Sequence, residues 1–237
     1  MMLIPSGVRS KTFQSVNAGG ERHGCLSIAV PHRMDPDDGE SPQPLRVAVK
    51  DCYFLRGLQN SLFNSAYYDT FTFAPFTASV VEYLVRKGVH ILGLTKLSTL
   101  IGWEEPMDAV DYLTPFDPRA DGYQSPACSS SGSAIAVAAY DWLDCAIGTD
   151  TTGSGRRPAL VNGVWQFRPS HEERLLYGLV KAYPRFDSPC VFARDLQTIE
   201  RVARSWLKMG DESPPPRNRP YSIIYPLEYL PVENRDQ

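Results

Sequence analysis

The amino-acid sequence predicts an α/β fold, in which helices cover a central sheet. Three short apolar runs, LRVAVKD, VHILGLTK and CAIGTD, have the length and the β-branched character of buried strands. The segments TASVVEYLVRKG and SAIAVAAYDWL, which lie between these runs, have compositions and periods typical of helices. Because strands and helices alternate along the chain, we expect a sheet with helices packed on it.

The chain begins with a segment that shows little periodicity. Residues 1–43 are rich in Ser, Gly and Pro and end in the acidic run MDPDDGESPQP. Such a composition buries little apolar surface, so we expect an extended or poorly ordered lead. The strand LRVAVKD follows Pro44, and Lys50 is expected to lie at its end.

The first predicted helix is amphipathic. Its apolar face consists of Val80, Val81, Leu84 and Val85. Thr77 is suited to cap its N-terminus, and Gly88 follows its last turn. The strand VHILGLTK comes next, and His90 within this apolar run is expected to lie in the core.

Two polar loops separate the later elements. The stretch FDPRADGYQSPACSSSGS has turn formers and no period, and a loop of this length inside a compact domain is usually functional. The small-residue helix SAIAVAAYDWL and the strand CAIGTD follow it, and then a second glycine-rich loop, TTGSGRRPA.

The C-terminal part is predicted to contain one more helix and one more strand. The helix lies near SPCVFARDLQTIERVARSWLKMG and stops at Gly210, with an apolar face formed by Val191, Leu196, Ile199, Val202 and Trp206. The segment DESPPPRNRP is a linker or turn. The run YSIIYPLEYL is expected to be a strand that has no partner after it.

Composition excludes several classes of function. The formal net charge is −3, and no run of Lys and Arg could track a phosphate backbone, so nucleic acid is not an expected partner. No apolar stretch approaches the roughly 20 residues of a membrane span, and no signal-peptide pattern is present, which predicts a cytoplasmic protein. The 5 cysteines are widely spaced and expected to be reduced, and the 4 scattered histidines predict neither a metal site nor a cofactor.

The two polar loops concentrate hydroxyl groups. A serine becomes a nucleophile only when a base accepts its proton, and the usual bases are histidine or a lysine kept neutral by burial. Neither loop contains a histidine, and no Gly-x-Ser-x-Gly elbow surrounds Ser130 or Ser154. A phosphate-binding loop would need a lysine after its glycines, where GTDTTGSGRR has arginines.

The blocks LRVAVKDCYFLRG, FDPRADGYQSPACSSSGSA and CAIGTDTTGSGRRPA resemble the signature blocks of the amidase signature family, which includes fatty acid amide hydrolase, malonamidase and the A chain of the amidotransferase. TASVVEYLVRKGVHILGLTKLS and DSPCVFARDL also resemble segments of the family. The similarity runs from about Leu45 to Leu196, in the family's order. It implies a mixed central sheet flanked by helices, the amidase-signature fold.

The resemblance implies a Ser-Ser-Lys triad. The family's lysine closes a strand like VAVKD, which corresponds to Lys50. Its nucleophile is the serine after the Gly-Thr-Asp block, which corresponds to Ser154. Its relay serine begins a Ser-Ser-Gly step, which corresponds to Ser130. We choose Ser130 over Ser129 because the 24 positions from residue 130 to residue 154 equal the family's usual spacing.

The chemistry of amide cleavage agrees with these roles. A lysine acts as a base near neutral pH only when its pKa is depressed, and a buried strand end provides such a place. Attack on the carbonyl builds an oxyanion, for which the backbone of Thr151, Thr152 and Gly153 can supply N–H donors. The family commonly has glycine where Thr152 stands. Asp150 and Arg156 are expected to form a supporting ion pair, with solvated loop charges as the alternative.

The expected function is therefore amidase activity on a small-molecule amide, through an acyl-enzyme intermediate. Members of the family usually have a much longer catalytic domain, so residues 44–237 are expected to form a partial domain, truncated at its C-terminus. A second hypothesis follows from this, a catalytically inactive amidase-like chain that acts as an interaction module or a non-functional fragment. An incomplete sheet exposes a strand edge, and we expect self-association through it.

Overall fold

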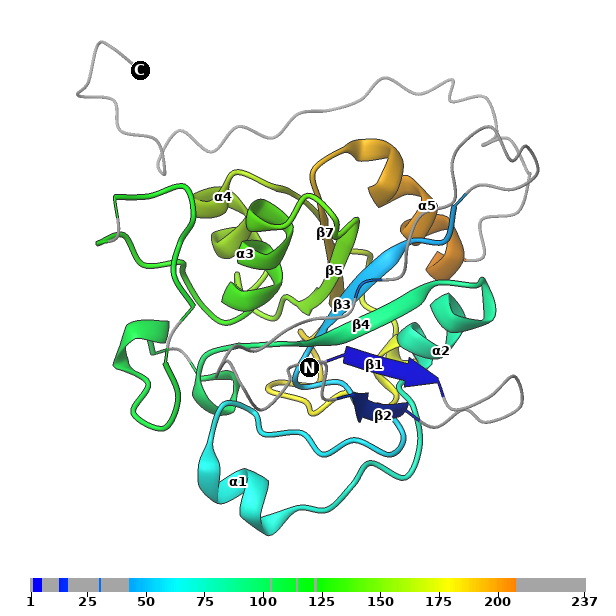
Figure 1. The fold of residues 1–237 in the computed structure, drawn as a ribbon, viewed down its shortest axis with the longest axis horizontal. Helices are drawn as coiled ribbons and strands as arrows, with labels where there is room; N and C mark the ends of the chain where they lie inside the picture. The colour runs from blue at the N-terminus through cyan, green and yellow to red at the C-terminus, as the bar shows by residue number, and fades with distance from the viewer. Residues whose placement is uncertain are drawn as a thin grey trace.

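The computed structural model describes residues 2–5, 13–16, 30, 43–102, 104–113, 115–121 and 123–207. A mixed sheet of five strands forms its centre, in the spatial order β4-β3-β5-β7-β6 (Figure 1). The strands are β3 (Arg46–Lys50), β4 (His90–Thr95), β5 (Cys145–Thr149), β6 (Trp165–Phe167) and β7 (Pro189–Ala193). β3 pairs in parallel with both β4 and β5, whereas β7 pairs antiparallel with β5 and β6. The predicted mixed sheet is thus confirmed.

Helices cover both faces of this sheet. α2 (Ser79–Arg86) and α5 (Leu196–Leu207) pack on one face, and α3 (Ser131–Ala139) and α4 (Arg156–Asn162) pack on the other (Figure 1). Alternate residues of β3 face the two layers: Val47 and Val49 belong to the larger core, and Ala48 to the smaller one. Because both faces are buried, the strands read as continuous apolar runs.

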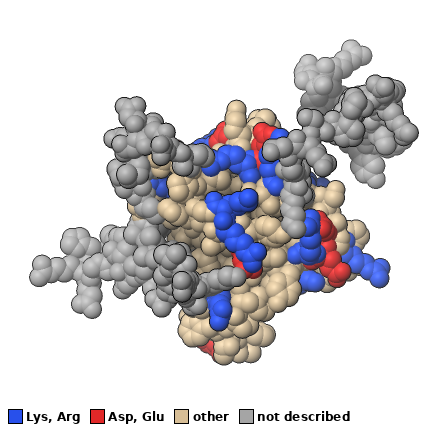
Figure 2. Space-filling model, turned by 90° about the vertical axis from the view of Figure 1, so that its right-hand side faces the viewer, with Lys and Arg blue, Asp and Glu red and all other residues tan. Residues whose placement is uncertain are grey.

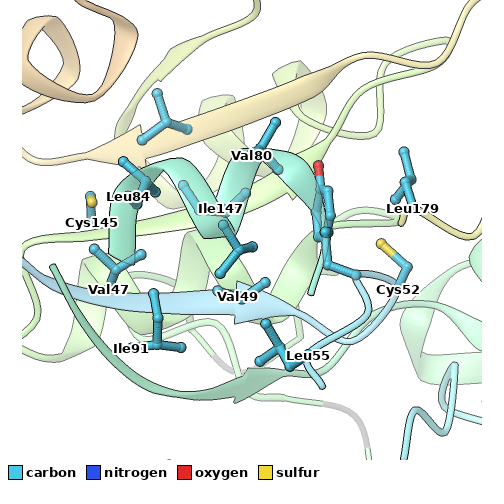
Figure 3. Close-up of a cluster of buried hydrophobic side chains, with 14 of the residues drawn as sticks. Val47, Val49, Cys52, Leu55, Val80, Leu84, Ile91, Cys145, Ile147 and Leu179 are labelled. Carbon is cyan, nitrogen blue, oxygen red and sulfur yellow. The ribbon is translucent and has the colours of Figure 1, made fainter. Parts of the chain in front are cut away.

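The larger core lies between the sheet and α2 with α5. Figure 3 shows Val47 and Val49 of β3, Ile91 of β4 and Ile147 of β5 pointing toward Val80 and Leu84 of α2. The α2 face was predicted correctly, with Val80, Val81 and Leu84 buried and Val85 half-buried. Gly88, with φ +81°, follows the helix as expected, and a left-handed residue at this place favours glycine.

Several smaller elements complete the described structure. β1 (Met2–Pro5) and β2 (Phe13–Val16) pair antiparallel within the N-terminal lead. α1 (Ser65–Thr70) and three 3₁₀ turns, η2 (Thr99–Ile101), η3 (Pro106–Asp108) and η4 (Glu173–Leu176), lie in connecting segments. The predicted strand YSIIYPLEYL lies outside the described residues.

Two predictions about single residues are wrong. His90 is exposed, because it is the first residue of β4, a strand at the edge of the sheet, and the core begins at Ile91. Ala78 precedes α2 at the cap position, where no side chain bonds to the helix. The hydroxyl of Thr77 instead accepts the N–H of Arg56 at 3.1 Å.

Two predictions about elements are also wrong. The end of the second polar loop is the helix α4, and its first turn tolerates Pro158 because an N–H there has no partner within the helix. The last predicted helix is in fact β7 followed by α5, so Val191 lies in a strand. Asp195, between β7 and α5, caps the N-terminus of α5, because its side chain accepts the N–H of Thr198.

The charged side chains on one face of the molecule form small groups. Figure 2 shows lysines and arginines in separate patches, several beside acidic side chains, with uncharged surface between them. Two ion pairs are helix-spaced: Arg86 bonds Glu82 on α2, and Arg204 bonds Glu200 on α5.

Candidate active site

The sheet brings the lysine and the two polar loops to one edge. β3 and β5 run in parallel, so their last residues, Lys50 and Thr149, lie at the same edge of the sheet. Ser130 directly precedes α3, which leads back along the sheet to β5. Ser154 lies in the turn that connects the end of β5 to the start of α4. The ends of β3 and β5 and the two polar loops therefore lie together at one edge of the sheet.

Lys50 is fully buried and surrounded by hydroxyl groups. Its Nζ donates to Ser129 Oγ at 2.8 Å, to Ser130 Oγ at 2.9 Å and to Thr149 Oγ1 at 2.7 Å. Burial lowers the pKa of Lys50 below its usual value of 10.5, because the ammonium form loses its hydration. The environment thus favours the neutral amine that a general base requires.

The two serines that contact Lys50 differ in their remaining bonds. Ser130 Oγ donates to Thr149 O at 3.0 Å and accepts the Thr149 N–H at 3.2 Å, so with Lys50 its one donor and two acceptor sites are used. Within the described residues, the Ser129 hydroxyl bonds only to Lys50, so its own proton has no acceptor. The peptide bond between Cys128 and Ser129 is cis.

Ser154 lies in a tight turn that is joined to the first loop. The Ser130 N–H donates to the backbone oxygen of Ser154 at 3.1 Å, which holds the two loops together. Gly153 has a φ of +134°, a backbone conformation that residues other than glycine rarely adopt. Ser154 is half-buried, and no described residue forms a hydrogen bond with its hydroxyl, which leaves the oxygen accessible.

Asp150 organises this turn. Its buried carboxylate accepts hydrogen bonds from the N–H groups of Gly153, Gly155 and Arg156 and from two nitrogens of the Arg156 guanidinium. Burial opposes the ionisation of Asp150, but the bonds from Arg156 outweigh it and hold the pKa of Asp150 below its usual value. The expected Asp150–Arg156 ion pair is present at 3.0 Å.

The backbone N–H groups expected to stabilise an oxyanion are not equivalent. The Gly153 N–H donates to Asp150 Oδ1 at 3.1 Å and is therefore engaged. The N–H groups of Thr151, Thr152 and Ser154 have no hydrogen-bond acceptor among the described residues. The donors left for an oxyanion are thus those of Thr151, Thr152 and Ser154.

A cavity of about 330 Å³ opens at Ser154. It is lined by Ile101, Gly102, Cys128, Thr151, Thr152, Gly153, Ser154, Arg157, Ala182 and Tyr183. Arg157 at its rim forms an ion pair with Glu105 at 2.8 Å, and Ser125 donates to the same carboxylate. Hydrogen bonds from Ser125 and Arg157 lower the pKa of Glu105.

Four contributors to the site escaped the sequence analysis. Motif spacing favours Ser130 over the adjacent Ser129, although Ser129 also contacts Lys50. Thr149 is the last residue of β5, and no sequence pattern indicated that its hydroxyl would contact Lys50. Tyr183 and Asp187, beside the turn, come from a segment about 30 positions later, and only the pairing of β7 with β5 brings them there.

The fold and the site define a class of protein, an α/β protein in which a fully buried lysine contacts serine hydroxyls beside a cavity. The Amidase family model matches residues 44–225. The chain therefore belongs to the amidase family, as its motifs indicated, and enzymes of this family act on carbon–nitrogen bonds.

Relatives of known name agree with this assignment. The chain is 39% identical over 162 residues to Amidase 1 of Arabidopsis thaliana, which covers 68% of this chain and 37% of the plant protein. It is 34% identical over 188 residues to Amidase 1 of Oryza sativa subsp. japonica, covering 79% of this chain and 42% of the rice protein.

A solved structure agrees as well. An amidase family protein from Bacillus anthracis superposes with a TM-score of 0.60 and 25% identity, covering 68% of this chain and 32% of that one. The chain thus spans between about a third and two fifths of the length of these relatives.

Other expectations concern groups outside the site. Cys52, Cys145 and Cys190 are free thiols, as predicted, the Cys128 sulfur accepts a hydrogen bond from Arg157 at 3.4 Å, and Cys25 lies outside the described residues. No group of three His, Cys, Asp or Glu side chains in the described part of the chain could hold a metal ion. No described helix is long and apolar enough to cross a membrane, and the cytoplasmic location stays a prediction.

Proposed function

We propose that this protein hydrolyses the amide bond of a small molecule through a Ser-Ser-Lys triad, with Ser154 as nucleophile and Lys50 as general base. The observation that carries the proposal is the fully buried Lys50 Nζ, which is hydrogen-bonded to two adjacent serines. No other charged group lies within hydrogen-bond distance of this amine among the described residues. A lysine placed in this way loses its proton more readily than one in water.

The proton path runs from Ser154 through a relay serine to Lys50. As the Ser154 oxygen attacks the carbonyl carbon, its proton passes to the relay serine, whose own proton passes to the neutral Lys50 amine. The tetrahedral intermediate then collapses, and the same path returns a proton to the leaving nitrogen, because an unprotonated amine leaves poorly. Water next attacks the acyl ester, and the acid and Ser154 are regenerated.

The hydrogen bonds favour Ser129 over Ser130 as the relay. A relay must be able to release its own proton, and that of Ser130 is donated to the Thr149 carbonyl oxygen. Ser129 contacts Lys50 equally closely and carries an O–H group without an acceptor in the described structure. We therefore propose Ser129 as the relay and Ser130 as the group that aligns Lys50 with the end of β5, which reverses the assignment made from spacing.

Labelling with a fluorophosphonate probe tests the nucleophile. The probe reacts with activated serines, so peptide mapping should find the label on Ser154, and Ser154→Ala should abolish it. Ser129→Ala should lower the labelling rate about a hundredfold or more, the usual contribution of a proton-transfer group. A label on another serine while Ser154 stays unmodified would refute the assignment.

The same experiment separates the two candidate relays. Both serines are fully buried, so Ser129→Ala and Ser130→Ala should be compared by their melting temperatures as well as by their labelling rates. We expect the larger loss of rate in Ser129→Ala and the larger loss of stability in Ser130→Ala, because the latter removes two bonds to the backbone of Thr149. The reverse pattern restores Ser130 as the relay. Failure of the folded wild-type chain to label at all would favour the inactive interaction module.

A further inference from the structure

The carboxyl group of Asp187 connects the nucleophile turn to the opposite wall of the cavity. Asp187 is 2% exposed, and its Oδ1 accepts the hydroxyl of Thr151 at 2.5 Å. The N–H of Tyr183 donates to both carboxyl oxygens at 3.1 Å. Thr151 begins the turn that ends at Ser154, whereas Tyr183 lines the cavity from the other segment. One buried group thus bonds to both sides of the cavity.

The strand pairing places Asp187 there. β5 and β7 are antiparallel, with Thr149 opposite Pro189 at the end of the ladder. One residue further, the Asp150 N–H donates to Ser188 O at 2.9 Å, which extends the register beyond both strands. The next pair along this register is Thr151 and Asp187, so the position of the carboxyl group is set by the sheet.

The segment that carries Tyr183 is itself closed by hydrogen bonds. The N–H groups of Phe186 and Asp187 both donate to Tyr183 O at 2.9 Å, and the rings of Tyr183 and Phe186 stack at 5.1 Å. Arg168 ties this segment to the nucleophile turn, because it donates to Phe186 O at 2.8 Å and to Asp150 O at 3.1 Å. The wall and the turn therefore form one connected unit.

We propose that Asp187 is a positioning residue of the amidase reaction, a role that rests on the proposed function. It holds Thr151 by the side chain and so fixes the backbone from which the N–H groups of Thr151 and Thr152 project. Oxyanion donors lower a barrier only when they are in place before the charge forms, because reorientation during the reaction would consume the gain. Asp187 touches neither the nucleophile nor the base and acts through Thr151.

The effect should appear in the chemical step and not in binding. Removing one oxyanion donor typically costs a hundredfold to a thousandfold in rate, so loosening the backbone that carries the N–H groups of Thr151 and Thr152 should cost less, about tenfold. Such a loss lowers the maximal rate of inactivation by a fluorophosphonate, kinact, because the phosphonyl oxygen occupies the oxyanion position. The concentration for half-maximal rate, KI, should change by less than about twofold, since ground-state contacts are kept.

The test uses substitutions on both sides of the Thr151–Asp187 hydrogen bond. Thr151→Val keeps the shape of the side chain and removes the hydroxyl, whereas Thr151→Ser keeps the hydroxyl. Asp187→Asn replaces one of the two acceptor oxygens by a donor that faces the Tyr183 N–H. Thr198→Val is the matched control, because Thr198 Oγ1 donates to Asp195 Oδ2 at 2.9 Å on α5, away from the cavity.

We expect Thr151→Val and Asp187→Asn to lower kinact about tenfold, Thr151→Ser to recover most of the rate, and Thr198→Val to match the wild type. Wild-type kinact in both variants, or a change in KI alone, would overturn the role of Asp187. Loss of cooperative melting in both variants would overturn it too, since the carboxyl group would then support the fold. If the wild-type chain is not labelled at Ser154, the proposed function fails, an outcome distinct from normal labelling in the variants.

Discussion

Asp150→Ala should destabilise the protein by much more than Arg156→Ala, although the two residues form one ion pair. The Arg156 side chain is 62% exposed, so in Asp150→Ala its guanidinium returns to water. In Arg156→Ala the buried carboxylate keeps its backbone N–H donors and the Arg168 guanidinium at 3.7 Å, so we expect the loss of the exposed partner to cost about 1 kcal/mol. Asp150 is fully buried and also accepts the N–H groups of Gly153 and Gly155, both of which are buried. Each buried donor left without an acceptor costs about 1–3 kcal/mol.

Summing these contributions, we expect Asp150→Ala to lower the free energy of unfolding by about 3 kcal/mol. For a chain of this size that corresponds to a fall in Tm of about 6–12 °C, against about 2–4 °C for Arg156→Ala. Thermal unfolding followed by circular dichroism, at equal protein concentration and ionic strength, measures both. Equal shifts in the two variants would show that the ion pair, and not the bonding of the turn to the carboxylate, stabilises this region.

Three further outcomes follow from the buried titratable groups. The rate of fluorophosphonate labelling should rise with pH and level off below 10.5, because burial lowers the pKa of Lys50 and only its neutral form is a base; Lys50→Met should abolish that rise. The pKa of Asp150 is held below 3.8, so the stability that its carboxylate contributes is present above that pH and is lost as the pH falls through the lowered pKa. Melting temperatures of the wild type and of Asp150→Asn, compared over an acid titration, should therefore converge only in strong acid. Burial raises the pKa of Cys52 and of Cys190 to about 12, so mass mapping after iodoacetamide treatment at pH 8 should find neither modified until denaturant is added.

Local sequence patterns predicted the elements that flank the lysine and the first serine loop. β3, α2, β4, α3 and β5 all lie where the apolar runs and helical periods indicated. The sequence predicted a helix in place of β7 because Val191 fits an apolar face that continues into α5, and only pairing with β5, at least 40 positions earlier, makes the segment a strand. The sequence suggested a loop in place of α4 because glycines precede it and Pro158 lies in its first turn, whereas Asp150 accepts the N–H groups of Gly155 and Arg156 at its start.

The proposed relay serine illustrates a limit of motif spacing. Counting from Ser154 back to the first loop passes through α3, β5 and the connection between them, residues 140–144. One residue more or less in that connection changes the count without moving either loop in space. The choice between Ser129 and Ser130 depends instead on which hydroxyl keeps its proton free, and that is set by contacts with the backbone of Thr149. Sequence separation does not encode those contacts.

The site divides into a part fixed by the sheet and a part formed by connections. Lys50 and Thr149 are strand ends, and Asp150 continues β5 in the extended ladder with β7, so the proposed base and the anchor of the turn move only if the sheet does. The cavity walls include Ile101 of η2, Arg157 of α4 and Tyr183, which begins the hydrogen-bonded turn before β7. Substitutions in those walls should therefore change which amide fits, while the proton path from Ser154 to Lys50 stays intact. Asp187 lies where the two parts meet, since it bonds the extended ladder on one side and the wall on the other, so its substitution should disturb the oxyanion donors without changing the pKa of Lys50.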